Sequence, residues 1–448
     1  LESDWIEDVV DMLKAGEALP HYRVLAVQAC NLSDAGSYIT QELGYAMAWG
    51  NELLAKLAEA GIPVDKVANK IKFNFGISSN YFMEIAKFRA ARWLWAEIVK
   101  AYDDPACTCR PDSSDKTADD SAFCRCACKI KIHAHTSAWN MTVFDAYVNM
   151  LRTQTEAMSA AIAGVDSITV SPYDDVFKTP DEFSERIARN QQLLLKEECH
   201  FDRVVDPGGG SYYIEVLTRS VAEAAWKLFL EVEDKGGFAV VANAGEVQQA
   251  VNESNSARKK QIATRRISLL GTNIFPNFTE IAGNKIEADS ECGCHCHKDS
   301  EIAKLDFSRG ASEFEALRLE TEKSGKRPKV FMLTIGNLAM RLARSQFSSN
   351  FFACAGYEIF DNLGFETVEA GVKAAREKNA DIIVLCSSDD EYATFAPEAF
   401  KLTGGKELFV VAGAPACMDD LKAAGIEHFI HVRSNVLETL QMFNRSLL

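Results

Sequence analysis

The sequence lacks long hydrophobic runs, a leader-like start and an excess of positive charge. No apolar stretch in the 448 residues approaches the roughly 18 to 20 residues that a membrane-spanning helix needs, and the N-terminus has no basic segment followed by an apolar one. Lysine and arginine number 48 against 64 aspartates and glutamates, a formal net charge of −16. These absences argue against a membrane protein and against nucleic-acid or anionic-membrane partners, so we expect a cytoplasmic protein.

The segment from Lys129 to Ile162 predicts a strand followed by a helix. Ile130 and Ile132 alternate with lysines, as in a short strand, and the polar run from His133 to Ser137 follows where this strand is expected to end. From Val143 to Ile162, apolar residues recur at spacings of three and four and form one helix face. A strand that ends in polar residues before a helix is how an α/β barrel builds a site.

Three further strand–helix units complete the N-terminal half. Strands are expected at 22–28, 71–75 and 167–170, and helices at 33–59, 80–102 and 181–198. Four successive units predict a parallel sheet. A closed barrel of this type needs eight strands, so the sequence predicts about half of one.

The C-terminal segment alternates more regularly. Strands are expected at 329–334, 358–360, 381–385, 408–411 and 428–432, with helices between them and a last helix at 436–443. Five short units of this kind indicate a flavodoxin-like doubly wound domain. Helical patterns at 214–270 and 307–326 fill the intervening region. The predicted domains are therefore 1–213, 214–327 as a helical linker region, and 328–448.

Most of the thirteen cysteines lie in two groups, each with C-x-C spacing. The candidate metal ligands are Cys107, Cys109, Cys124, Cys126 and Cys128 in the first group, and Cys292, Cys294, Cys296, His295 and His297 in the second. Such residues can hold zinc, although paired cysteines in structural zinc sites usually have two to four residues between them. A zinc site and a cluster of reduced surface cysteines both stay open.

Three ordered motifs resemble the barrel domain of methylmalonyl-CoA mutase. They are the run from His133 to Thr153, the stretch Arg186-Ile-Ala-Arg-Asn and the stretch Asp206-Pro-Gly-Gly-Gly-Ser-Tyr-Tyr. Catalytic chains of that family read roughly HCQTSGWSLT, ARIARN and DPxxGSYY. The C-terminal domain similarly resembles the cobalamin-binding module of these mutases. The resemblance implies the C-terminal part of a TIM (β/α)8 barrel, a linker and a flavodoxin-like domain.

The C-terminal domain departs from the family at the residues that hold the cofactor. Catalytic members carry D-x-H-x-x-G in the first loop of this module, and its histidine coordinates cobalt. Leu338, Met340 and Ala343 stand here in place of the aspartate, the histidine and the glycine. A thioether is a poor replacement for imidazole, and no carboxylate is present to orient a ligand. The resemblance therefore implies the fold of the module without a bound cofactor.

The barrel departs from the family in a similar way. Three family residues, Tyr, His and Gln, are replaced by Cys30, Asn31 and Ser33. Lys70 stands where the family has an arginine, and lysine lacks the bidentate fork that binds a carboxylate. His133 stands at the position of the catalytic histidine, and His135 replaces a glutamine. A histidine at a strand end can act as a general acid, but we interpret His133 as a vestigial, structurally satisfied residue.

A chain with both mutase folds and altered site residues most resembles the small, non-catalytic subunit of heterodimeric members. The resemblance implies a large-subunit partner that holds adenosylcobalamin and interconverts (R)-methylmalonyl-CoA and succinyl-CoA in propionate metabolism. Two alternatives stay open: an independent adenosylcobalamin-dependent acyl-CoA mutase, and a non-enzymatic metal-binding scaffold built on the cysteine groups.

The family match begins partway along the barrel. We therefore expect residues preceding Leu1 in the natural protein to supply the other strands. An open half-barrel would expose an edge strand and the apolar side chains that normally fill the barrel interior in layers. We expect the 448 residues alone to be aggregated or molten.

Overall fold

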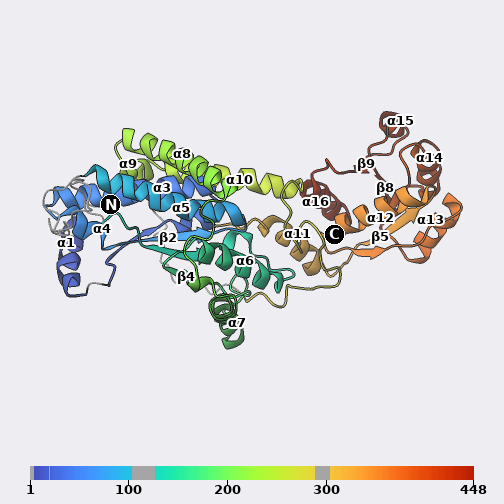
Figure 1. The fold of residues 1–448 in the computed structure, drawn as a ribbon. Helices are drawn as coiled ribbons and strands as arrows, with labels where there is room; N and C mark the ends of the chain where they lie inside the picture. Colours follow the sequence, from blue (N-terminus) through green and yellow to red (C-terminus); the bar gives the residue numbers. More distant parts are fainter. Residues whose placement is uncertain (1–4, 20, 103–126, 288–302) are drawn as a thin grey trace.

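The computed structural model of the chain describes residues 5–19, 21–102, 127–287 and 303–448 (Figure 1). A four-stranded parallel sheet lies in one half of the molecule and a five-stranded parallel sheet in the other, with helices between and around them. This arrangement confirms the α/β prediction. None of the helices in the described ranges is long and apolar enough to span a membrane.

The first sheet has the order β1-β2-β3-β4, and all its neighbouring strands are parallel. Its strands are β1 (Leu25–Gln28), β2 (Ile71–Ile77), β3 (Ile132–Thr136) and β4 (Ser167–Thr169). Each predicted strand is present, but β3 begins three residues later than expected. His133 and His135 lie within this strand, so the expectation that the polar run follows the strand is wrong.

Five α-helices accompany the first three strands. They are α1 (Trp5–Ala15), α2 (Cys30–Asp34), α3 (Ile39–Glu59), α4 (Val64–Ala68) and α5 (Tyr81–Ala101). The single helix expected from residue 33 to 59 is two helices, because Gly36 between them has a φ of +87°. A Cβ atom at Gly36 would lie 2.7 Å from Oδ1 of Asn255, so both the backbone angle and the space favour glycine.

The next helices run from the fourth strand to the second sheet. They are α6 (Val148–Ile162), α7 (Glu182–Leu193) with a π-helical turn at Leu194–Glu198, α8 (Tyr212–Asp234), α9 (Phe238–Asn243), α10 (Glu246–Ala263) and α11 (Ser312–Lys323). The expected start of α6 at Val143 is wrong, because Asp145 is in the left-handed region with a φ of 52° and ends any earlier turn. The buried core around the first sheet continues into α8 and α10, across the expected boundary at residue 213.

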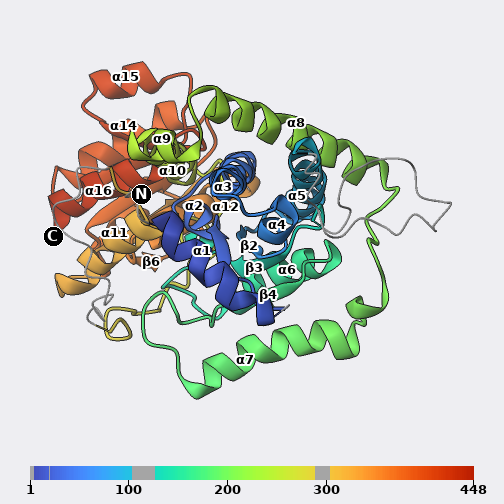
Figure 2. The same ribbon diagram turned by 90° about the vertical axis from the view of Figure 1, so that its left-hand side faces the viewer.

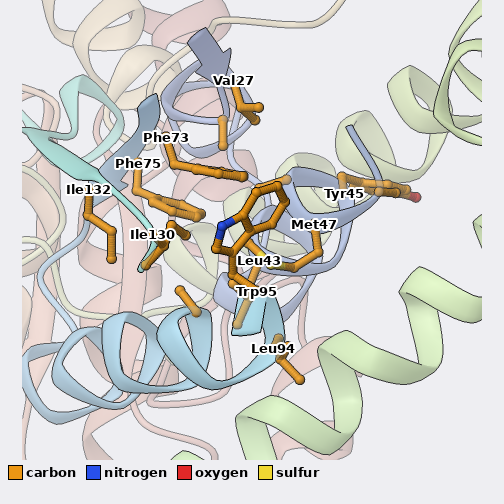
Figure 3. Close-up of a cluster of buried hydrophobic side chains, with 14 of the residues drawn as sticks. Val27, Leu43, Tyr45, Met47, Phe73, Phe75, Leu94, Trp95, Ile130 and Ile132 are labelled. Atoms are coloured by element: carbon orange, nitrogen blue, oxygen red, sulfur yellow. The ribbon is translucent and has the colours of Figure 1, made fainter. Parts of the chain in front are cut away.

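One face of the first sheet carries the core of this half (Figure 3). Val27, Phe73 and Ile132 are neighbours in register on three adjacent strands, and all are buried against α3 and α5. The rings of Phe73 and Trp95 meet edge to face, with centroids 4.7 Å apart. α8 packs outside α3 and α5, while α7 lies on the opposite side of the molecule (Figures 1 and 2). Each large side chain buried here contributes about 1.5 to 3 kcal/mol.

The other face of the first sheet is polar. Successive residues of a strand point to opposite faces, so the row Gln28, Asn74, His133 and Ser167 lies opposite Val27, Phe73 and Ile132. The expectation that apolar side chains cover this face is wrong for the described strands. Polar side chains are compatible with this face, because the apolar helices pack against the other face of the sheet.

The second sheet has the order β6-β5-β7-β8-β9. Its strands are β5 (Lys329–Thr334), β6 (Glu358–Phe360), β7 (Ile382–Cys386), β8 (Leu408–Ala412) and β9 (His428–Ile430). Its helices are α12 (Leu338–Ala353), α13 (Val368–Glu377), α14 (Tyr392–Thr403), α15 (Met418–Ala423) and α16 (Val436–Leu447). Both faces are apolar, because Val330 and Met332 belong to one buried cluster while Phe331 and Leu333 belong to another.

Candidate functional site

The polar row of the first sheet joins side chains from all four strands. Gln28, Asn74, His133 and Ser167 are successive register partners across β1 to β4. Nδ2 of Asn74 donates to Oε1 of Gln28 at 2.8 Å, and Nδ1 of His133 lies 2.8 Å from Oγ of Ser167. These hydrogen bonds fix the side chains in one arrangement.

His133 has both ring nitrogens occupied. Besides Ser167 on Nδ1, the hydroxyl of Thr169 lies 3.2 Å from Nε2. Partial burial, with smaller contributions from the positive charges of Lys72 and His135, lowers the pKa of His133. The imidazole is therefore neutral at physiological pH, with one nitrogen donating to a hydroxyl and the other accepting from one.

His135 lies two residues further along β3, near two carboxyl groups. Its Nε2 is 3.5 Å from Oγ of Ser171. Burial raises the pKa values of Asp34 and Asp175, and the charge of His135 opposes that rise for both. Asp34 accepts hydrogen bonds from Oγ of Ser137 at 3.0 Å and from the backbone N–H of Ala138 at 2.9 Å. These contacts order the loop after β3.

The three residues that replace family side chains after β1 form the short helix α2. Sγ of Cys30 lies 3.8 Å from Oε1 of Gln28 and from Oδ1 of Asn31. Burial, reinforced by Asp34, raises the pKa of the Cys30 thiol to about 12. A protonated thiol is a poor nucleophile. Ser33 packs closely over the backbone of β2 at Gly76.

Lys70 is not part of this site. It precedes β2, at the amino end of the sheet, where its Nζ donates to the carbonyl oxygens of Gly16 and Leu19 at 2.7 Å each. The sequence comparison treated Lys70 as a remnant of a carboxylate-binding arginine. The geometry instead makes it an anchor for the segment that precedes β1.

A buried ion cluster on α3 and α5 was missed in the sequence. Nζ of Lys87 lies 2.7 Å from Oε2 of Glu42 and 2.6 Å from Oε2 of Glu84, and it donates to the carbonyl of Gly76 at 2.5 Å. The N–H of Gly76 donates to Oε1 of Glu42 at 2.6 Å. Burial raises the pKa of Glu42 to about 7, although the charge of Lys87 opposes the rise. The only sequence signal is three charged residues on otherwise apolar helix faces, Glu42 on α3 and Glu84 and Lys87 on α5.

These side chains complete the backbone hydrogen bonds of β2. β1 ends at Gln28, which pairs with Asn74, so no residue of β1 pairs with Gly76. Glu42 and Lys87 satisfy the Gly76 N–H and carbonyl instead. An unpaired buried backbone group would cost about 1 to 3 kcal/mol, so the ion cluster has a direct structural role here.

In the C-terminal domain, the residues compared with the cofactor-binding motif form a helix. Leu338 is the first residue of α12, and Oδ1 of Asn337 caps the helix by accepting from the N–H of Met340 at 3.1 Å. Leu338 is 60% exposed and Met340 is 37% exposed. Their side chains therefore lie on the surface of the first helical turn.

A carboxylate bridges the loops at the carboxyl ends of β5 and β7. Glu391 Oε2 accepts from the hydroxyls of Ser388 and Ser387 at 2.7 Å each, and from the N–H of Asn337 at 3.1 Å. These hydrogen bonds lower the pKa of Glu391 to about 2. Gly336, with a φ of +76°, leaves room for the carboxylate. In sheets of this strand order, ligands usually bind between these two loops.

The predicted metal ligands lie almost entirely outside the described residues. Only Cys128 among them is described, next to β3. The other nine are Cys107, Cys109, Cys124, Cys126, Cys292, Cys294, Cys296, His295 and His297. The described part of the chain contains no group of three or more His, Cys, Asp or Glu residues that could hold a metal ion. The zinc site stays a prediction.

Comparisons with known proteins identify relatives over most of the chain. A family model described as methylmalonyl-CoA mutase matches residues 3–320. The chain is 64% identical over 442 residues to the methylmalonyl-CoA mutase small subunit of Porphyromonas gingivalis, covering 98% of this chain and 68% of that protein. It is 31% identical over 449 residues to the small subunit of Propionibacterium freudenreichii, covering 98% and 64% respectively.

A large subunit is also similar, over a shorter stretch. The chain is 35% identical over 274 residues to the methylmalonyl-CoA mutase large subunit of Streptomyces virginiae, which covers 61% of this chain and 35% of that protein. The chain thus spans about two thirds of the length of the small subunits named above.

Proposed function

This chain belongs to the methylmalonyl-CoA mutase family, and we propose that it acts as the small subunit of a heterodimeric methylmalonyl-CoA mutase. In this proposal a large subunit holds adenosylcobalamin and interconverts (R)-methylmalonyl-CoA and succinyl-CoA. The present chain stabilises and completes that partner without carrying out the chemistry. The observation that carries the proposal is 64% identity over 98% of the chain to a protein named as a small subunit.

The C-terminal domain does not fit a cobalamin. Leu338 and Met340 offer no imidazole or carboxylate, and both lie on the first turn of a capped helix. Glu391 bridges the two loops between which a ligand would enter a sheet of this strand order. We therefore assign the cofactor to the partner and derive no step of the reaction through this chain.

His133 has a supporting role in this proposal. Its two ring nitrogens are hydrogen-bonded to the hydroxyls of Ser167 and Thr169. To bind a substrate carbonyl, His133 would have to give up one of these hydrogen bonds. This favours a structurally satisfied histidine over an active general acid. A His133→Ala variant of the complex is expected to keep the wild-type kcat.

The finer fold and location are part of the same proposal. We infer that the four-stranded sheet is part of a TIM barrel and that residues 328–448 form a flavodoxin-like domain, since the order β6-β5-β7-β8-β9 is that of flavodoxin-like sheets. The proposed location is the cytoplasm. The exposed thiol of Cys199, which forms no disulfide, fits a reducing compartment.

Co-purification with the large subunit tests the proposal. The chain is expressed in its full natural form with the large subunit of the same source, and subunit ratio, cobalamin content and mutase activity are measured. We expect a one-to-one complex with one cobalamin per heterodimer and no cobalamin on the small subunit purified alone. Stoichiometric uptake by the small subunit alone, with the visible corrinoid spectrum, would support an independent mutase instead.

A gain-of-motif variant sharpens the assignment of the cofactor. Leu338→Asp combined with Met340→His restores the ligand residues without changing the cap at Asn337 or the bridge at Glu391. We expect little cobalamin binding, because residue 343 is still not glycine and the loops stay bridged. Tight binding by this variant would contradict the fit argued above.

A further inference from the structure

A cavity of about 530 Å³ lies where the first sheet meets α10. Its walls include Thr40 in the first turn of α3, Met83 in the first turn of α5, and the side chains of Trp139 and Arg258. Trp139 lies in the run from His133 to Thr153, whereas Thr40, Met83 and Arg258 lie outside the three family motifs. The cavity is separate from the polar row around His133, whose residues do not line it.

Arg258 brings a positive charge to this cavity without a matching negative one. Its Nη1 donates to the carbonyl oxygens of Gly36 and Ser37 at 3.1 and 3.2 Å, and its Cζ lies 3.4 Å from the ring centre of Trp139. Within the described ranges, no carboxylate forms an ion pair with it. Burial lowers the pKa of Arg258 to about 10, so the group stays protonated at neutral pH.

Arg258 is partly buried, and taking a guanidinium out of water without a counter-charge has a free-energy cost. The two carbonyl oxygens satisfy part of its hydrogen-bonding capacity, and the Trp139 ring adds a cation–π contact. Neither carries a full negative charge. The one carboxylate that lines the cavity, Glu42, already has both oxygens engaged by Gly76 and Lys87.

Two helix N-termini add positive potential at the same place. α3 and α5 each have 21 residues, and residues of both first turns line the cavity. The first backbone N–H groups of a helix have no acceptor within the helix, and the helix dipole places partial positive charge there. Helix starts of this kind commonly bind phosphate or carboxylate groups.

Ser37 supplies an independent sign that a ligand is expected. The residue is 6% exposed and lines the cavity, yet its Oγ has no hydrogen-bond partner among the described residues. Buried hydroxyls are nearly always hydrogen-bonded. An oxyanion in the cavity would accept from this hydroxyl.

We propose that this cavity binds a small anion, a carboxylate or a phosphate, between Arg258, the hydroxyl of Ser37 and the first turns of α3 and α5. Its volume exceeds that of a single carboxylate group, so the anionic group belongs to a small molecule. The proposal does not depend on the proposed mutase role, because Arg258 and Ser37 are not among the residues compared with the family's site, although Ser33, which is one of them, also lines the cavity.

Anion titration of the complete subunit complex tests the site. Inorganic phosphate and malonate are each titrated by calorimetry and by thermal unfolding, against chloride at equal ionic strength. The wild type is expected to bind one of these anions and to gain thermal stability from it. Whether phosphate or malonate binds distinguishes the two chemistries. Equal behaviour of both anions and chloride in the wild type would overturn the proposal.

Variants locate the site within the chain. Arg258→Gln is expected to abolish the anion-specific stabilisation, and Ser37→Ala to weaken binding about tenfold or more, since a hydrogen bond to a charged group is lost. Arg266→Gln, which removes the same charge from an exposed position nearby, is the matched control and keeps wild-type binding. Unchanged binding in Ser37→Ala and Arg258→Gln would overturn the assignment, as would a protein carboxylate found against Arg258 in a crystal structure of the complex.

The two proposals can fail separately. Subunit assembly and mutase activity report on the proposed function, whereas the anion titration needs no turnover. A complex that is active but does not distinguish phosphate or malonate from chloride refutes only the anion site. A chain that binds the anion but does not assemble with a large subunit refutes only the mutase role.

Discussion

The two parallel sheets of this chain differ in what covers them. In the second sheet, alternate residues of β5 and β7 enter two separate apolar clusters, one on each face. In the first sheet, one face holds Val27, Phe73 and Ile132 against helices, while the opposite face presents Gln28, Asn74 and His133. Parallel sheets usually have apolar cover on both faces. The second sheet is complete by this criterion, and the first has only one such layer.

The comparison shows that the residue composition of a strand indicates which of its faces are packed against helices. It does not decide whether the strand forms. β7 is apolar at every position because both its faces are packed. β3 alternates histidine with alanine because only one of its faces meets the helices. We expect the polar face of the first sheet to contribute through hydrogen bonds and the helix-facing side through apolar burial.

The largest expected effect tests the two faces of the first sheet. Phe73→Ala should lower the free energy of unfolding by about 3 to 5 kcal/mol, because it empties a fully buried site next to Trp95. Ser167→Ala on the opposite face should change it by about 0.5 to 1.5 kcal/mol, because it removes the hydrogen bond with His133. Urea unfolding followed by tryptophan fluorescence measures both. Equal losses for the two variants would break the comparison.

The buried ion cluster gives the next effect. Lys87→Met leaves Glu42 and Glu84 buried without their counter-charge and should cost about 3 to 5 kcal/mol. Lys56→Met removes an exposed pair with Glu59 and should cost less than about 1 kcal/mol. If Lys87→Met unfolds no more easily than Lys56→Met, the cluster does not support β2.

The second sheet should respond equally on its two faces. Met332 and Leu385 are both fully buried, in different clusters on opposite faces. Replacement of either by alanine should cost about 2 to 5 kcal/mol. Thermal unfolding of the two single variants provides the measurement. If only one of the two variants lost stability, one face of this sheet would need no apolar cover, as is the case for the polar face of the first sheet.

The smallest effect depends on pH and concerns the helix layer of the first sheet. Burial raises the pKa of Glu156 on α6 well above its usual value, although Nδ2 of Asn140 donates to Oε1. The folded state therefore holds a proton that the unfolded state has released above about pH 4.5, and stability falls as pH rises from there. Glu156→Gln removes the titrating group and with it this decrease in stability at higher pH.

The expected pattern for Glu156→Gln is a gain that grows with pH. Variant and wild type should unfold at similar temperatures near pH 4, and the variant should be more stable near pH 8. Differential scanning calorimetry at a series of pH values measures the difference. A variant that is less stable than wild type at every pH would show that Glu156 is ionised and paired in the folded state.

Sequence reasoning succeeded where both faces of a strand are apolar. The bounds of β5 agree with the predicted 329–334, because its apolar run is short and bounded by turn residues. The edge strand β6, which contains Glu358 and is half-buried, also agrees with the predicted 358–360. The order of the four strands in the first sheet was also predictable from their succession. The predicted position of β3 was too early in the chain. Its histidines were interpreted as the loop after the strand, although they belong to the strand itself.

Features that depend on tertiary contacts could not be predicted. The break between α2 and α3 follows from the close approach of Asn255 to Gly36, more than two hundred residues apart. The role of Lys70 depends on carbonyl oxygens in the segment before β1. Arg258 is followed in the sequence by Lys259 and Lys260, and nothing there distinguishes it from them. Its packing against Trp139 is visible only in the folded chain.

The side chains that complete β2 at Gly76 have a consequence for hydrogen exchange. The Gly76 N–H lies beyond the last pair between β1 and β2, where a frayed sheet margin would exchange its amide hydrogen quickly. Here that amide donates to Glu42, which is held by Lys87. Exchange at Gly76 therefore requires the ion cluster to open. Its protection factor is a site-specific measure of how often the charged interior of this half of the molecule admits water.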